Sequence, residues 1–246
     1  MPDIAPVLDV ASLGKDYGPV TALKSLDCRV EAGEIVGLLG PNGSGKTTTM
    51  KLLMGLLRPS RGKASFAGID CTHDSRRVKA RVGYMPDEPS FYDFLTGRET
   101  IDFAVAVRGV GRDVAWTYLE PVVARIEAGA ILDSPVGGYS HGTKKKLALL
   151  LALAHRPSLL LLDEPTNGLD PPTAVRVRAL LREIAVTGVA AIVSTHLLDM
   201  ADVLCDRVLV LHRGSLVAQG TTREVRAQAG VSESASLEDA FLELVK

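Results

Sequence analysis

The chain has 246 residues, enough for one large domain or two small ones, and its hydrophobic content of 46% is ordinary for a globular protein. The formal net charge is -1 and no long basic block occurs, which argues against nucleic acid as the main partner. The three cysteines lie far apart and form no C-x-x-C pair, so we expect reduced, mostly buried thiols in a cytosolic protein and no zinc site.

The segment from Met1 to Leu13 is acidic and lacks a long apolar core, so it is not expected to be a signal peptide. The most apolar region, Leu147 to Leu162, is interrupted by His155-Arg156-Pro157, and the runs that remain are too short to span a bilayer. We therefore expect a soluble chain. If it works at a membrane, another polypeptide must supply the spans.

The first thirty residues alternate loosely between apolar and polar side chains, which predicts antiparallel strands. A buried strand over Glu34 to Leu39, the loop Gly40 to Thr47 and a helix over Thr47 to Leu57 follow. The loop fits G-x-x-x-x-G-K-[ST] at every constrained position, and strand and helix both stand where this phosphate-binding motif needs them. A chance match in a polar loop is the alternative.

The chemistry of this loop predicts that it binds a nucleoside triphosphate. Its glycines let backbone N–H groups close around phosphate oxygens at a helix N-terminus. Lys46 can neutralise the β- and γ-phosphates, and the Thr47 hydroxyl can join the shell of a Mg²⁺ ion. The candidate nucleotide-binding residues here are Asn42, Gly43, Ser44, Gly45, Lys46, Thr47 and Thr48.

Strands and helices alternate along the rest of the chain. We expect strands over Lys63 to Phe66, Val82 to Met85, Leu159 to Leu162 and Ala190 to Val193, and two short ones around Arg213-Gly214. Helices are expected over Thr96 to Val107, Arg112 to Ala128, Ser140 to Arg156, Pro172 to Thr187 and Leu237 to Val245.

This order predicts an α/β fold with a mostly parallel sheet, right-handed crossovers and an N-terminal antiparallel β subdomain. We interpret the chain as one domain. Its core would comprise residues 1–87 and 157–220, a helical subdomain residues 88–156, and a C-terminal helical tail residues 221–246.

Two carboxylates follow the four-leucine strand. A carboxylate at the C-terminal end of a buried strand points into the crevice where ligands sit in open α/β sheets. Asp163 could hold Mg²⁺ through water, and Glu164 could act as the general base on an attacking water. A strand-end turn with two solvated acids is the alternative. His196 ends the next strand and could sense transferred charge, although a lone histidine there is more often structural.

Taken together, the residues resemble the nucleotide-binding subunit of an ATP-binding cassette (ABC) transporter over nearly the whole chain. The resemblance rests on an ordered series. It comprises Tyr17, GPNGSGKTT (Gly40 to Thr48), YMPDEPSFYDFLT (Tyr84 to Thr96), YSHGTKKKL (Tyr139 to Leu147), LLLLDEPTNGLD (Leu159 to Asp170) and STH (Ser194 to His196). The most specific part is YSHGT (Tyr139 to Thr143), here called the signature segment, because it occupies the position of the family signature.

The resemblance implies an ATPase that uses ATP and Mg²⁺. Tyr17 would stack on adenine, with a strand-end aromatic that fills a surface groove as the alternative. Glu164 would be the catalytic base and His196 the switch histidine. Ser140 and Gly142 would contact the γ-phosphate of ATP held by a second, facing subunit, in a homodimer or a heterodimer.

Two departures from the family pattern stand out. Asp87 replaces the usual glutamine; its oxygens could bind Mg²⁺ or water, but it has no amide donor. The signature usually reads LSGGQ, and here His141 and Thr143 replace a glycine and the glutamine. Both departures are familiar in subunits that pair with separate membrane proteins of the exporter type.

We therefore expect a cytoplasmic subunit, peripheral on the inner face of the cell membrane, that energises transport through an integral membrane subunit. A soluble cassette ATPase without a transport role and a small kinase are the alternatives. Phe91, Tyr92 and Phe94 cluster after Asp87 and precede the helix expected from Thr96. They are either local core or an anchor for a short helix of the membrane subunit.

Overall fold

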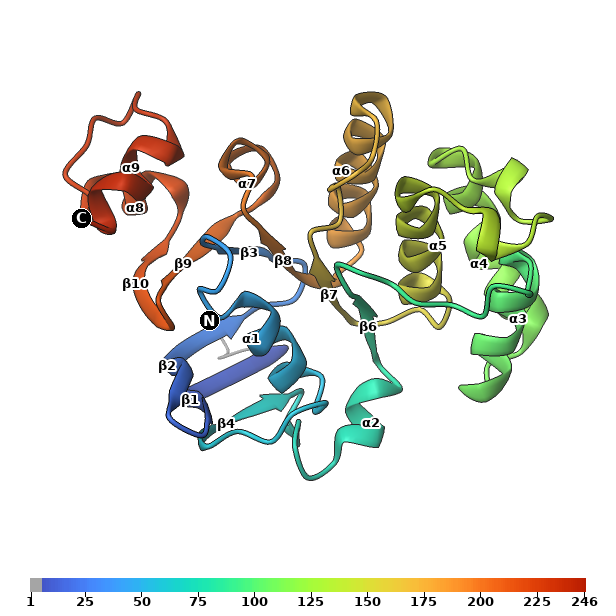
Figure 1. Cartoon of the computed structure of the whole chain (residues 1–246), viewed down its shortest axis with the longest axis horizontal. Coiled ribbons are helices and arrows are strands. Elements are labelled where there is room, and N and C mark those ends of the chain that lie inside the picture. The colour runs from blue at the N-terminus through green and yellow to red at the C-terminus, as the bar shows by residue number, and fades with distance from the viewer. Residues whose placement is uncertain (1–5) are drawn as a thin grey trace.

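The computed structural model describes residues 6–246. Residues 1–5 lie outside the described residues. The predictions that the core begins at residue 1 and that the N-terminal segment is not a signal peptide fall partly on these residues. Figure 1 shows a sheet that runs across the molecule, with helices α3, α4 and α5 gathered at one end and the C-terminal helices α8 and α9 at the other.

The strands of the described residues form a single ten-stranded sheet with the order β5-β4-β1-β2-β10-β9-β3-β8-β7-β6. Its strands are β1 (Leu8–Tyr17), β2 (Val20–Val30), β3 (Ile35–Leu39), β4 (Arg61–Phe66), β5 (Ile69–Asp70), β6 (Val82–Met85), β7 (Leu159–Asp163), β8 (Ala190–Thr195), β9 (Arg207–His212) and β10 (Ser215–Gly220).

The helices lie between and beyond these strands. They are α1 (Lys46–Leu53), α2 (Ser75–Lys79), α3 (Gly97–Val107), α4 (Arg112–Arg125), α5 (His141–Leu153), α6 (Pro171–Val186), α7 (Leu198–Leu204), α8 (Thr222–Gln228) and α9 (Leu237–Leu244), with 3₁₀ turns over Gly129–Ile131 and Val136–Gly138.

Pairing in the sheet divides it into two parts. Strands β9, β3, β8, β7 and β6 pair in parallel, whereas β1 pairs with β2 and β4 in antiparallel fashion, as β10 does with β9. The predicted fold class, a mostly parallel α/β sheet with antiparallel N-terminal strands and added helices, is therefore confirmed.

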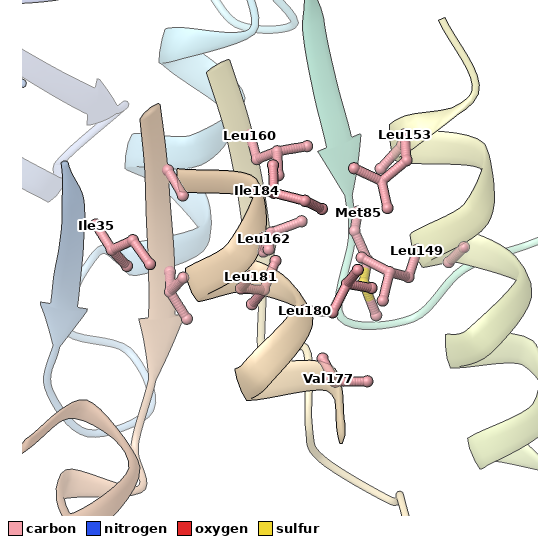
Figure 2. Close-up of a cluster of buried hydrophobic side chains, with 14 of the residues drawn as sticks. Ile35, Met85, Leu149, Leu153, Leu160, Leu162, Val177, Leu180, Leu181 and Ile184 are labelled. Carbon is pink, nitrogen blue, oxygen red and sulfur yellow. The ribbon is translucent and has the colours of Figure 1, made fainter. Parts of the chain in front are cut away.

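The four leucines of β7 explain why this strand lies in the middle of the core. Leu160 and Leu162 pack with α5 and α6 in one cluster, drawn in Figure 2. Leu159 and Leu161 belong to the cluster on the other face of the sheet, because side chains alternate along a strand. Both faces are covered, so the strand needs a continuous apolar run. It holds Asp163, its last residue, and Glu164, the next residue, at a fixed place.

Three predicted helices are shorter than expected, and the backbone gives the reason. Helix α1 ends at Leu53 rather than Leu57, and Gly55 has a φ of 61°. Helix α4 ends at Arg125 rather than Ala128, and Glu127 has a φ of 52°. Helix α5 spans His141–Leu153 rather than Ser140 to Arg156, and Arg156 also has a φ of 52°. A left-handed residue cannot continue a right-handed helix, so each helix stops before it.

Four short elements were missed by the sequence analysis: β5, α2, α7 and α8. Each has seven residues or fewer, too short for a helical or strand period to stand out. Their formation depends on neighbours; α8, for example, contacts β10 and α9. None of the helices formed by residues 6–246 combines the length and the apolar character that crossing a bilayer requires.

Candidate functional site

The phosphate-binding loop joins the end of β3 to the start of α1, as predicted. Gly40 and Gly45 have φ values of 149° and 110°, which favour glycine. A Cβ on Gly40 would lie 2.2 Å from the carbonyl oxygen of Leu211, and one on Gly45 would lie 2.7 Å from that of Ala22. The loop is thus closely packed against β9 and β2, and only glycine fits at these two positions.

Polar groups in this loop lack a full set of protein partners. The Lys46 ammonium is buried and donates to the carbonyl oxygens of Gly40 (2.6 Å) and Pro41 (3.2 Å). Burial lowers its pKa, while the charges of Glu164 and Asp163 oppose that shift. Among the described residues, the buried Ser44 hydroxyl makes no hydrogen bond. An anion with several acceptor oxygens would satisfy both groups, so the loop fits a phosphate.

Cavities open on both sides of the loop. One, of about 230 Å³, is lined by Ala22 and by the loop residues Asn42, Gly43, Gly45, Lys46, Thr47 and Thr48. The other, of about 350 Å³, lies between Gly40 to Asn42, the start of α7 and helix α9, and His196 lines it. All the predicted loop residues except Ser44, which is buried beneath, therefore border a space that a ligand could enter.

Asp163 lies beside this loop at the end of β7. Its Oδ2 accepts a hydrogen bond of 3.0 Å from the Thr47 hydroxyl, and its Oδ1 accepts one from Ser194. The hydroxyl and the carboxylate supply two hard oxygen donors next to the phosphate loop. Mg²⁺ prefers such oxygens and completes its shell with water and phosphate, so this pair fits the ion.

Glu164 turns sharply away from β7, with a φ of 50°. Its carboxylate is buried and points to the end of β8. Oε1 accepts the backbone N–H of His196 at 2.9 Å and lies 2.8 Å from His196 Nδ1, which we assign as a second donor. Oε2 accepts the Thr195 hydroxyl at 3.1 Å. The structure thus joins two residues that are 32 positions apart in the sequence, as the predicted site requires.

Asp87 has a partner that the sequence analysis missed. Its Oδ1 lies 2.9 Å from the ammonium of Lys145, a side chain with no exposed surface. The signal was present in the sequence, because Lys145 stands three and four residues before Ala148 and Leu149 and so shares the buried face of α5. Asp87 keeps Oδ2 without a hydrogen bond among the described residues.

The signature segment begins α5. Ser140 is the N-cap, and its hydroxyl accepts the N–H of Thr143 at 3.2 Å. Gly142 and His141 pack against Gly168, in the turn that follows Glu164. No residue from 139–143 lines either cavity at the phosphate loop. Figure 1 shows β7 and α6 between α1 and α5.

Tyr17 ends β1, opposite Val20 of the adjacent β2. The ring is half-exposed, and the Lys15 ammonium lies 5.2 Å from its centroid. Residue Ala22 of the same hairpin lines the cavity at the phosphate loop. Tyr17 is therefore on the element that borders this cavity.

The predicted aromatic cluster divides into two parts. Phe91 packs against the core, whereas Tyr92 and Phe94 are exposed, Phe94 by 77%. The ring centroid of Tyr92 lies 5.8 Å from that of Phe94, in a tilted arrangement, and 6.0 Å from that of Phe103, an exposed residue of α3, in an edge-to-face arrangement. The exposed aromatic patch is thus formed by Tyr92, Phe94 and Phe103, and the sequence analysis missed Phe103 because it lies in the following helix.

Comparison with known proteins gives consistent matches. Residues 23–167 match the family model described as "ABC transporter". The chain is 37% identical over 215 residues to the uncharacterized ABC transporter ATP-binding protein YdbJ of Bacillus subtilis, covering 87% of this chain and 69% of that protein. It is 34% identical over 241 residues to the probable multidrug ABC transporter ATP-binding protein YbhF of Escherichia coli, covering 97% of this chain but 42% of that longer protein.

Comparison with solved structures gives the same family. The structure of an ATP-binding subunit of an ABC transporter superposes with a TM-score of 0.91 at 32% identity, covering 98% of this chain and all of that one.

The contact between Gly142 and Gly168 generates a prediction. A Cβ at Gly142 would lie 2.6 Å from the Gly168 carbonyl oxygen, whereas one at Gly138 meets nothing within 4 Å. Overpacking of this kind costs about 1–3 kcal/mol, offset by up to about 1 kcal/mol of helix propensity. We expect Gly142→Ala to unfold at lower denaturant concentration than wild type. Gly138→Ala is the matched control, and equal midpoints for the two variants would contradict the contact.

Proposed function

The chain belongs to the ABC transporter family as an ATP-binding subunit, and on that premise we propose that its ATP hydrolysis drives export through a separate membrane protein. The observation that carries the proposal is the grouping at one place of the phosphate loop, the Thr47–Asp163 contact and the Glu164–His196 pair. Export is supported by the name of another relative, the Nod factor export ATP-binding protein I of Burkholderia lata, to which the chain is 36% identical over 219 residues. We retain the division into core, helical subdomain 88–156 and tail 221–246 as part of this proposal.

Each side chain then has a role that its contacts support. Lys46 and the loop amides bind the β- and γ-phosphates, and Tyr17 packs against the adenine. Thr47 and Asp163 would hold Mg²⁺, with Asp87 reaching it through Oδ2 or a water. When bound, the ion neutralises charge on the phosphate oxygens. The fit of ATP and Mg²⁺ rests on the buried donors and the paired oxygens described above.

Glu164 and His196 would act on the attacking water. Glu164 accepts a proton from the water, for which its carboxylate must be ionised and close to the γ-phosphate. His196 donates from Nδ1 to Glu164, and in its imidazolium form Nε2–H can also donate toward a γ-phosphate oxygen in the cavity beside the phosphate loop that His196 lines. The hydrogen bond thus orients both residues before the substrate binds.

We further propose that two such subunits face each other with ATP between them. Ser140 and Gly142 contribute to neither cavity at their own phosphate loop. The N-terminus of α5 nevertheless has the geometry that binds anions, and it would reach the γ-phosphate held by the facing copy. Each site is therefore incomplete in one chain alone.

The exposed aromatic patch is our candidate contact with the membrane subunit, which would keep this chain on the inner face of the cell membrane. Aromatic side chains with half or more of their surface exposed are typical interface anchors. The patch begins five residues after Asp87 and continues onto α3, so its position can respond to the occupancy of the ATP site. Phe91 is part of the core and is not included.

The role of Glu164 is tested by Glu164→Gln. The amide cannot accept the proton of the water but occupies the same volume, so ATP binding should persist while turnover falls by at least about 100-fold. Phosphate release and equilibrium ATP binding should be measured together. Glu120→Gln, an exposed residue of α4, is the control and should keep the wild-type rate. A Glu164→Gln protein that hydrolyses ATP at the wild-type rate would show that another group is the base.

The aromatic patch is tested by Phe94→Ala, with co-expression of the membrane subunit through which this chain is proposed to act. The substitution removes an exposed ring, so ATP hydrolysis by the isolated subunit should stay within about twofold of wild type. The affinity for the membrane protein should fall about 30-fold, and co-purification with it should fall accordingly, since an anchor residue typically contributes about 2 kcal/mol. Val107→Ala on the same helix as Phe103 is the control. Undiminished co-purification of Phe94→Ala would remove this surface from the interface.

A further inference from the structure

We propose that Lys145 is a positioning residue for Glu164. It holds the backbone turn that aims the carboxylate and ties this turn to the helix that carries the signature segment. The effect on turnover rests on the ATPase function proposed above, whereas the effect on the turn does not. Lys145 does not line either cavity at the phosphate loop, so it acts through its neighbours and not on ATP.

The Lys145 ammonium uses all three of its protons on one small region. It donates to the carbonyl oxygen of Glu164 at 2.9 Å, to that of Asp163 at 3.3 Å and to Asp87 Oδ1 at 2.9 Å. The side chain is completely buried. A lysine is almost never buried so fully unless its charge is paired and its protons are all satisfied, and here both conditions hold.

The region that Lys145 contacts is the strained one. Glu164 has a φ of 50°, an unfavourable conformation for a residue with a side chain. Its N–H donates to the Ser194 carbonyl at 2.9 Å, and its own carbonyl accepts from Lys145 and, at 3.2 Å, from the N–H of Asn167. These bonds fix both peptide groups of Glu164. Of the two hydrogen bonds to the Glu164 carbonyl, the one from Lys145 is the shorter, and its donor is a charged ammonium group.

The same side chain connects the turn to two other parts of the site. Lys145 lies in α5, whose N-cap is Ser140, so the signature segment and the Glu164 turn are joined by a buried bond in addition to the Gly142–Gly168 contact. The ammonium also neutralises Asp87, which would otherwise leave a bare carboxylate near the expected γ-phosphate. Asp87 stands where the family usually has an uncharged glutamine, and Lys145 compensates for this extra charge.

A lysine that only fills the core would have different consequences. Its loss would lower the melting temperature and loosen α5 along its length. A positioning role predicts a local effect at residues 163–170 and a loss of turnover without loss of ATP affinity. Lys145→Met is the test variant, because it keeps the length of the side chain and removes its protons. Lys144→Met is the matched control, since Lys144 is the half-buried neighbour whose side chain makes no hydrogen bond among the described residues.

Amide hydrogen exchange of the nucleotide-free protein tests the turn without any assumption about catalysis. In Lys145→Met, we expect exchange in peptides covering 163–170 to be about tenfold faster, with β3 and the rest of α5 changed less than about twofold. Lys144→Met should match wild type throughout. Lys145→Arg, which keeps the charge and the donors, should restore most of the protection. If Lys145→Met does not fold, Lys145→Gln, which retains N–H donors, is measured in its place.

Steady-state ATPase kinetics then test the consequence. Lys145→Met should lower kcat by about tenfold or more while the KM for ATP changes less than about threefold, and Lys145→Arg should recover kcat. Unchanged exchange at 163–170, or unchanged kcat in a variant whose turn has loosened, would overturn the inference. A wild-type protein without ATPase activity would contradict the proposed function instead, and the exchange data would still decide the role of Lys145.

Discussion

The backbone conformation of Glu164 is the constraint on which the site depends. The chain leaves β7 at Asp163 and turns left-handed at Glu164, at an expected cost of about 1–3 kcal/mol. Without this turn, the carboxylate would continue the alternation of the strand and could not meet both His196 and Thr195. The turn persists because β7 is buried on both faces and because Ser194, Asn167 and Lys145 all bond the peptide groups of Glu164.

The same turn links hydrolysis to the part of the chain that would face a second subunit. Gly168 lies a few residues beyond Glu164 and contacts His141 and Gly142 at the start of α5. Lys145, one turn further along that helix, bonds the Glu164 carbonyl. A displacement of α5 by an ATP-bound partner would therefore act directly on the residue proposed as the base. This arrangement gives a physical route by which two half-sites can be coupled.

The parts of this architecture that the sequence predicted are those with local signals. The phosphate loop, the four-leucine strand and the longer helices have periods or motifs that are visible in a few residues. The contacts that were missed depend on the tertiary fold. Lys145 stands in a run of three lysines, and only burial of one helix face distinguishes it from its neighbours. Phe103 joins the aromatic patch across a loop, and α7 and α8 are too short to show a period.

The central claim, that each ATP site is completed by a second copy, is tested most directly by the mass of the Glu164→Gln protein in solution. Size-exclusion chromatography with light scattering should show a dimer with ATP and Mg²⁺ and a monomer with ADP. Adding Ser140→Asp keeps the N-cap of α5 but sets a negative charge against the γ-phosphate, so the double variant should remain monomeric with ATP. A Glu164→Gln protein that stays monomeric at high concentration with saturating ATP and Mg²⁺, or a Ser140→Asp variant that dimerises equally well, would contradict the account.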